Sequence, residues 1–192
     1  MMGRSKLRRD DRGATLVEAA IVYGLLFLTI LAVLEFGLAF KDWLSISHSS
    51  REGARAGATY GNDPTADIQI LRDIETTLAP TAIDAGMQVR VFQAPVGPST
   101  TYTYTPGSDC SDLSPGMTLT GCCDWTPCPE PFRATYVTPV WDPATRDIEA
   151  PITDRIGVEV EYTHQWFTGL FGTTTDFTTA TDFQIEPQVF ES

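Results

Sequence analysis

Residues 12–40 read R-G-A-T-L-V-E-A-A-I-V-Y-G-L-L-F-L-T-I-L-A-V-L-E-F-G-L-A-F, and this stretch decides the architecture of the 192-residue chain. After Gly13 it is almost entirely apolar, with Glu18 and Glu35 as its only acidic residues. From Ala14 to Phe40 a helix would extend about 40 Å, enough to cross a hydrocarbon core about 30 Å thick. A single span in lipid must be helical, because only helices and closed barrels satisfy their own backbone polar groups there. We therefore predict a transmembrane helix that begins near Ala14.

The charges on either side of this stretch predict its orientation. Residues 1–13 carry five basic and two acidic side chains, so the acidic excess behind the formal charge of −12 lies in the rest of the chain. Basic residues next to a span stay on the cytoplasmic side, which places the N-terminus inside and the C-terminal part outside. The competing interpretation is a cleaved secretory signal. The apolar run is longer than an ordinary signal core and no A-x-A site follows it, which favours a retained anchor.

The helix is expected to continue beyond the membrane as a spine. Residues 41–60 contain no proline, and the first strong breaker is Gly-Asn-Asp-Pro at 61–64. Trp43 stands where an aromatic residue at the outer interface is expected. We therefore predict one helix over residues 14–61, after a leader at 1–13 that has no fold of its own.

Residues 62–192 are predicted to form a small extracytoplasmic α+β domain. Asp63 and Pro64 are typical of a helix start, and a short helix is expected up to about residue 80. Strands are predicted at 87–92, 156–162 and 177–185, with a further candidate at 134–141. The sheet would be antiparallel with three or four strands. Residues 94–134, rich in cysteine and proline, are expected to be an irregular insertion.

The N-terminal motifs resemble those of a known family. Gly13, then Ala14 as a new first residue and Glu18 as the fifth, resembles a type IV prepilin processing site. Together with L-E-F-G at 34–37 and R-E-G-A-R-A-G-A at 51–58, the pattern resembles the TadE-like pilus-assembly proteins of bacterial Tad (tight adherence) systems. The resemblance is close over roughly the first 58 residues. The last predicted strands, around V-E-V-E-Y and D-F-T-T-A-T-D-F-Q-I-E-P, resemble the family's terminal strands more loosely.

The resemblance implies a function and a set of partners. A prepilin peptidase of the inner membrane would cut between Gly13 and Ala14, where a glycine leaves the protease cleft unobstructed. The mature chain would be a minor pilin or pseudopilin, since the major pilins of such systems are much shorter. Its partners would be other pilins or pseudopilins, the Tad inner-membrane assembly machinery and the lipid bilayer. The alternative for Gly13 is a glycine that only starts the helix.

Two further features of the helix suggest contacts. A carboxylate at Glu18 would pair with the amine that cleavage creates on Ala14, of its own chain or of a neighbour, to register subunits. The alternative is a side chain that reaches the cytoplasmic headgroups, as Glu35 would reach the outer ones. Gly53, Gly57 and Gly61 repeat at four-residue spacing, so one helix face can approach another backbone closely. That neighbour is either another subunit or, as is more common, the chain's own domain.

The cysteines predict disulfides rather than a metal site. Cys110, Cys122, Cys123 and Cys128 form an even set in a segment expected to be exported, so two disulfides are expected, with three possible pairings. Zinc is the alternative, but the C-C-x4-C spacing lacks the usual C-x2-C pairs and no histidine is near.

No motif in the sequence indicates catalysis. His48 and His164 accompany no recognisable nucleophile pattern, and we expect surface or packing roles for both. There is no phosphate loop, metal-ligand run or dinucleotide fingerprint, so no cofactor and no metal are expected. The acidic outer domain argues against nucleic-acid binding, which needs a basic face. We predict a structural assembly component rather than an enzyme. The alternative is a single-pass surface adhesin or binding protein that never enters a filament; a membrane-tethered enzyme would need a polar pocket that the sequence does not reveal.

Overall fold

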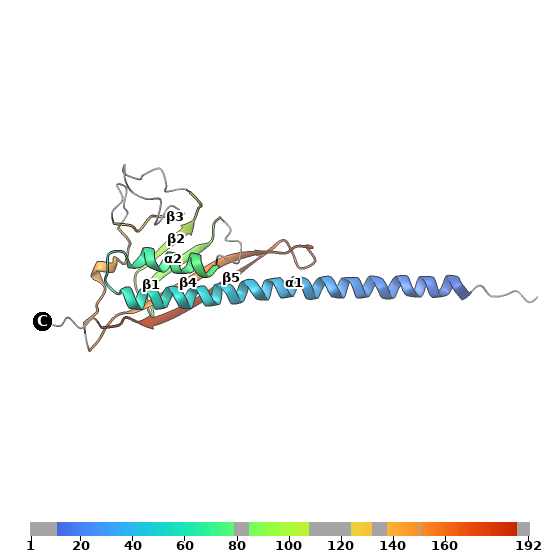
Figure 1. Cartoon of the computed structure of the whole chain (residues 1–192), viewed down its shortest axis with the longest axis horizontal. Coiled ribbons are helices and arrows are strands. Elements are labelled where there is room, and N and C mark those ends of the chain that lie inside the picture. Colours follow the sequence, from blue (N-terminus) through green and yellow to red (C-terminus); the bar gives the residue numbers. More distant parts are fainter. Residues whose placement is uncertain (1–10, 79–84, 108–123, 132–137, 150, 188–192) are drawn as a thin grey trace, which may run out of the picture.

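The computed structural model describes residues 11–78, 85–107, 124–131, 138–149 and 151–187. It shows one long helix that carries an α+β domain on its C-terminal half (Figure 1). Helix α1 (Asp11–Tyr60) has 50 residues and is therefore about 75 Å long. It ends at Gly61, whose φ of 52° is left-handed and whose N–H donates to the Gly57 carbonyl at 3.0 Å. The predicted long N-terminal helix and the α+β class are both confirmed.

Helix α2 (Ala66–Leu78) follows after a short turn. The Asp63 carboxylate accepts hydrogen bonds from the backbone N–H and the hydroxyl of Thr65, at 2.7 and 2.6 Å, just before the helix begins. Its apolar stripe is fully buried against α1 and the sheet, and it comprises Ile68, Ile70, Leu71, Ile74 and Leu78. The predicted short helix is therefore confirmed, with a capping aspartate at its start.

The sheet has five antiparallel strands in the order β3-β2-β1-β4-β5. The strands are β1 (Gln88–Gln93), β2 (Ser99–Tyr104), β3 (Trp125–Thr126), β4 (Arg155–Gln165) and β5 (Thr174–Gln184). A short 3-10 helix, η2 (Pro143–Thr145), precedes β4. Three of the predicted strands correspond to β1, β4 and β5. The candidate at 134–141 lies largely outside the described residues, and its described part, 138–141, is not a strand.

The expectation of an irregular segment over 94–134 is wrong for β2 and β3, and the sheet has more than the three or four strands predicted. In β2, Thr100 and Tyr102 point inward and are buried, while Thr101 is exposed. The alternation is present, but a threonine stands at one of its inward positions. A hydropathy pattern therefore does not separate the two faces, although threonine and tyrosine suit a pleated strand.

The helices cover one face of the sheet and form a single core with it. Opposite pairs such as Val89 with Val160 and Val91 with Val158 are fully buried on that face. The other face is polar and bears the half-exposed pair Arg90–Glu159, with 2.8 Å between guanidinium nitrogen and carboxylate oxygen. This one-sided burial explains the clear period of two in β4.

An ion pair is buried between α2 and the segment after η2. Arg146 contacts Asp67, and the two side chains are 0% and 1% exposed. The Tyr102 hydroxyl donates to the same carboxylate at 2.6 Å, and the Arg146 guanidinium lies 4.5 Å from the centre of the Trp141 ring. Burial and the neighbouring carboxylate raise the pKa of Tyr102 far above its ordinary value of 10.

Candidate functional site

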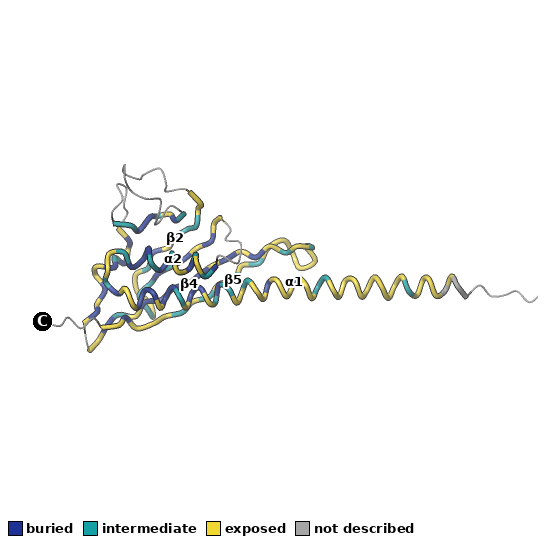
Figure 2. The backbone as a smooth tube through the Cα atoms, in the orientation of Figure 1, coloured by how far each residue is buried: buried dark blue, intermediate teal, exposed yellow. Residues whose placement is uncertain are grey.

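The N-terminal half of α1 projects from the domain with no protein packed around it (Figures 1 and 2). Its apolar side chains are exposed, for example Leu16 at 72%, Leu25 at 70% and Phe27 at 64%. Within the part of the chain that the structure describes, this is the one helix apolar and long enough to cross a membrane. The most apolar 18-residue window has a mean hydropathy of 2.4, and none of it is buried. Such a surface is unfavourable in water and suits a membrane anchor.

The residues of the predicted processing site lie at the exposed beginning of this helix. Gly13 is exposed, and a Cβ placed on it would meet nothing within 4 Å. Glu18 is also exposed, and among the described residues it makes no hydrogen bond or ion pair. Ala14 belongs to the same first turns of α1, and residues 1–10 lie outside the described part. Within the described part of the chain, nothing therefore occupies the Glu18 carboxylate.

Glu35 is placed differently from our expectation that it reaches the outer headgroups. It is only 3% exposed, because the loop between β4 and β5 covers it. One carboxylate oxygen accepts a hydrogen bond from the backbone N–H of Thr168, and the other oxygen is buried without a partner among the described residues. The expectation failed because the contact joins residues 133 positions apart, which no local pattern reveals.

The two histidines differ in their surroundings. His48 is exposed on α1, and His164 is 4% exposed near the end of β4. The His164 Nδ1 lies 2.8 Å from a carboxylate oxygen of Asp42, and its ring contacts Trp166 edge-on at 4.8 Å and stacks on Phe177 at 5.7 Å. Because Asp42 lies on α1 and His164 on β4, the contact joins the β4–β5 hairpin to the helix.

Two of the three glycines in the predicted packing ladder face the chain's own domain. A Cβ at Gly53 would lie 2.9 Å from the Ile74 side chain, and one at Gly57 would lie 2.6 Å from Ile156. The missing side chains thus let α1 approach α2 and β4 closely. Gly61 instead follows the helix and takes the left-handed conformation described above.

Of the four cysteines, only Cys128 is among the described residues. It is 7% exposed, belongs to the core and is not a free thiol. Cys110, Cys122 and Cys123 lie outside the described part, so the two disulfides and their pairing remain a prediction.

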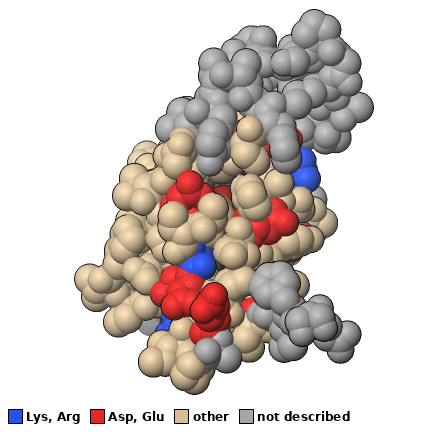
Figure 3. Space-filling model, turned by 90° about the vertical axis from the view of Figure 1, so that its left-hand side faces the viewer, with Lys and Arg blue, Asp and Glu red and all other residues tan. Residues whose placement is uncertain are grey.

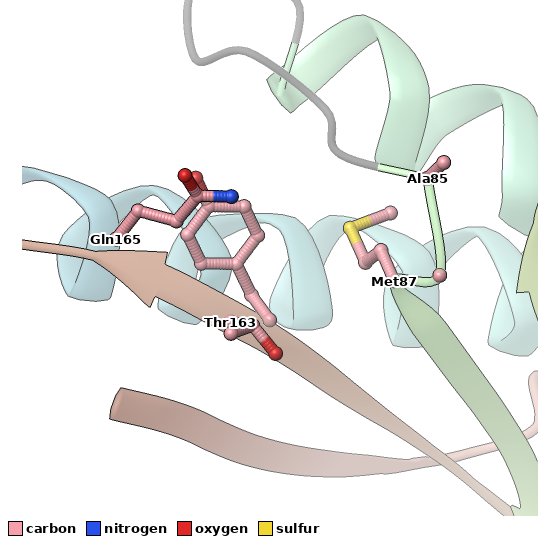
Figure 4. Close-up of a pocket in the computed structure, with 6 residues that line it drawn as sticks. Ala85, Met87, Thr163 and Gln165 are labelled. Carbon is pink, nitrogen blue, oxygen red and sulfur yellow. The ribbon is translucent and has the colours of Figure 1, made fainter. Parts of the chain in front are cut away.

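The described residues line several cavities, and the His164–Asp42 pair borders one of them, about 440 Å³ in volume. Another cavity, of about 260 Å³, lies between the start of β1 and the end of β4, with Ala85 and Met87 on one side and Thr163 and Gln165 on the other (Figure 4). Its lining includes no acidic, basic or cysteine side chain. No group of three potential metal ligands occurs in the described part of the chain.

The surface of the domain opposite the bare helix is acidic. Figure 3 looks at this end of the molecule and shows more Asp and Glu than Lys and Arg among the described residues. The formal charge of −12 agrees with this picture. Such a surface favours solubility outside the membrane and offers no basic patch on this face for an anionic polymer.

Comparison with known proteins finds one match. Residues 13–55 match the family model of TadE-like proteins. The match begins at the candidate cleavage glycine, includes the bare half of α1, and ends within the part of α1 that packs on the domain. No curated protein and no solved structure matches the chain.

Proposed function

We propose that this chain, whose residues 13–55 are TadE-like, is a minor pilin or pseudopilin of a Tad-type pilus or secretion apparatus. The family points to Tad pilus systems, and the apolar N-terminal helix points to membrane anchoring. In the proposal the leader stays in the cytoplasm and the acidic domain lies outside. A prepilin peptidase removes the leader after Gly13, and the mature subunit joins or primes a filament with other pilins and the Tad inner-membrane machinery.

The observation that carries the proposal is the bare N-terminal half of α1, with Glu18 exposed near its beginning and unpaired among the described residues. A helix half that exposes apolar side chains and packs on nothing is unfavourable in a soluble domain, and an acidic residue inside an apolar run suggests a partner for its charge. Cleavage would create a positive amine on Ala14, four residues before Glu18. In lipid each of these charges is unfavourable by about 2.5–3.5 kcal/mol when alone, so pairing between subunits favours association.

The alternative function is a membrane-anchored adhesin or binding protein that never enters a filament. Such a protein would use the same helix as an anchor and the segment around the cysteines as its binding surface. The two functions differ in the fate of the leader, because an ordinary anchor keeps residues 1–13.

N-terminal mass spectrometry of the protein recovered from membranes tests the proposal. We expect the mature chain to start at Ala14 when an active prepilin peptidase is present, and Gly13→Leu to retain the leader. An intact leader in the unsubstituted protein would refute processing and favour the anchored adhesin.

The role of Glu18 is tested separately, by Glu18→Gln. This variant should insert and be cut normally but be lost from the sheared pilus fraction, because it lacks the charge that pairs with the amine. Glu52→Gln is the matched control, since Glu52 lies on the same helix but within the domain. Equal pilus fractions for both variants would remove the pairing role.

A further inference from the structure

The β4–β5 hairpin extends past the rest of the sheet and lies along α1 (Figure 1). Strand β1 pairs with β4 only between Ile156 and Glu161, whereas β4 and β5 stay paired as far as Gln165 and Thr174. The last part of the hairpin is therefore a two-stranded ribbon, and two strands alone are marginally stable in water. Contacts with α1 support it.

These contacts bring the tip of the hairpin, residues 166–173, to the apolar half of α1. The Phe36 ring lies 5.9 Å from Trp166 and 4.7 Å from Phe171, measured between ring centres. One residue earlier on α1, Glu35 accepts the hydrogen bond from Thr168. Glu35 precedes Lys41, the first charged residue after the apolar run, by six residues or about 9 Å of helix. The tip thus contacts α1 within its apolar run, on the N-terminal side of Lys41, where the helix becomes polar.

The surface of the tip is apolar and uncharged. Residues 165–175 read Q-W-F-T-G-L-F-G-T-T-T and contain no charged side chain. Phe167 is 87% exposed, Leu170 50% and Phe171 43%. A large aromatic exposed to this degree at the end of a hairpin is unfavourable in water.

The tip and α1 also enclose an apolar groove between them. It has a volume of about 480 Å³, and its lining includes Leu31, Leu34 and Leu38 of the helix and Phe167 of the tip. Because Leu34 and Leu38 belong to the exposed surface of the candidate membrane span, the groove continues that surface onto the hairpin. Lipid that surrounds the outer end of the span would therefore also contact the groove.

Half of the backbone N–H groups of the tip, residues 166–173, have partners within the chain. Non-helical backbone at membrane depth needs internal partners for its polar groups. The backbone N–H groups of alternate residues of the tip donate hydrogen bonds within the chain. Trp166 donates to the Thr173 carbonyl at 3.0 Å, and Thr168 donates to the Glu35 carboxylate. Leu170 donates to the Thr168 hydroxyl at 3.2 Å, and Gly172 donates to the Gly169 carbonyl at 3.4 Å. The indole N–H of Trp166 also donates to the Thr175 hydroxyl at 2.8 Å. The tip can therefore lose water without losing these bonds.

We propose that residues 166–173 are a second membrane-inserted element, which dips into the outer leaflet beside α1 at the boundary between headgroups and acyl chains. Lipid acyl chains fill the groove. Glu35, with one oxygen bonded by the tip, docks the loop on the helix and is shielded by it. The inference rests on the membrane-anchoring part of the proposed function. It assigns lipid, and not a second copy of the chain, because the groove is continuous with the span and the tip carries no charge.

Bromine quenching in nanodiscs tests the depth of the tip. The full-length protein is placed in discs of phosphatidylcholine and phosphatidylglycerol, with or without bromine at mid-chain, and its tryptophan emission is recorded. Phe167→Trp adds a reporter at the tip. Ile152→Trp adds one at a 77% exposed position before β4, and Leu25→Trp adds one inside the span. The unsubstituted protein supplies the background of the four native tryptophans.

Bromine should reduce the added emission of both Phe167→Trp and Leu25→Trp, because a residue seated about 5–10 Å into the boundary comes close to the brominated chains. It should leave the added emission of Ile152→Trp unchanged. Quenching of Leu25→Trp without quenching of Phe167→Trp would overturn this inference and leave the anchor intact. No quenching of either would overturn the anchor as well. Blue-shifted but unquenched emission from Phe167→Trp would assign the groove to a protein neighbour and overturn the lipid assignment.

Discussion

Asp67→Asn would measure how strongly the buried ion pair holds the domain together. The substitution keeps the shape of the side chain but leaves the Arg146 charge uncompensated, and that side chain is 0% exposed. Within the described ranges the Nε and Nη1 atoms of Arg146 already lack hydrogen-bond partners, so the Asp67 carboxylate is the main group that compensates its charge. Removing one partner of a buried pair destabilises a protein by about 3–5 kcal/mol. We expect a loss in this range.

A matched control comes from Asp182, which pairs with Arg155 on the polar surface. The side chains of that pair are 56% exposed for Arg155 and 39% for Asp182, so water and salt screen the attraction. Asp182→Asn should therefore cost only about 0.2–1 kcal/mol. The same chemical change is thus made in two pairs that differ chiefly in burial.

Thermal unfolding in detergent, followed by near-ultraviolet circular dichroism, distinguishes the two variants. We expect the midpoint to fall by about 10 °C for Asp67→Asn and by about 3 °C or less for Asp182→Asn. The double variant Asp67→Asn, Arg146→Met removes both buried charges and should recover most of the loss. Equal midpoints for the two single variants, or no recovery in the double variant, would refute the argument that the unpaired charge is the cause.

Three further outcomes are expected. Gly57→Ala should destabilise the domain by about 1 kcal/mol, after allowing for the better helix propensity of alanine, because its Cβ would clash with Ile156. Adding Ile156→Val should relieve this clash, so the double variant should lose less stability than the two single losses added together. If the two losses simply add, the close approach of Gly57 and Ile156 is contradicted. Burial raises the pKa of Glu75 above its ordinary 4.5, although the Trp125 indole donates to it. The folded state thus binds this proton more tightly, so the unfolding free energy should fall as the pH rises from about 4.5 through the folded pKa, and Glu75→Gln should flatten that slope in a urea titration. Non-reducing mass analysis of the exported protein should find no free thiol among the four cysteines, and four reactive thiols would contradict both the two disulfides and the export.

The elements that were predicted correctly are those whose evidence is local. The long helix follows from an apolar run without proline, and α2 follows from the Asp63 cap and an apolar stripe. Strand β4 alternates between buried apolar residues and polar ones because only one face of the sheet meets the helices. The candidate processing site, which stays a prediction, also rests on a local pattern, since Gly13 and Glu18 lie within six residues of each other. Periodicity and short-range capping are enough to reveal such features.

The features that were missed depend on residues far apart in the chain. Strand β2 was hidden because threonine occupies an inward position, and its pairing with β1 is what shows it to be a strand. Asp67 lies 79 residues from Arg146, and Glu35 lies 133 residues from Thr168. Glu35 in an apolar run is indistinguishable in sequence from a side chain that reaches the headgroups. Only the folded hairpin, which supplies a backbone donor and a cover, buries it, because burial and hydrogen bonding arise from neighbours in space rather than along the chain.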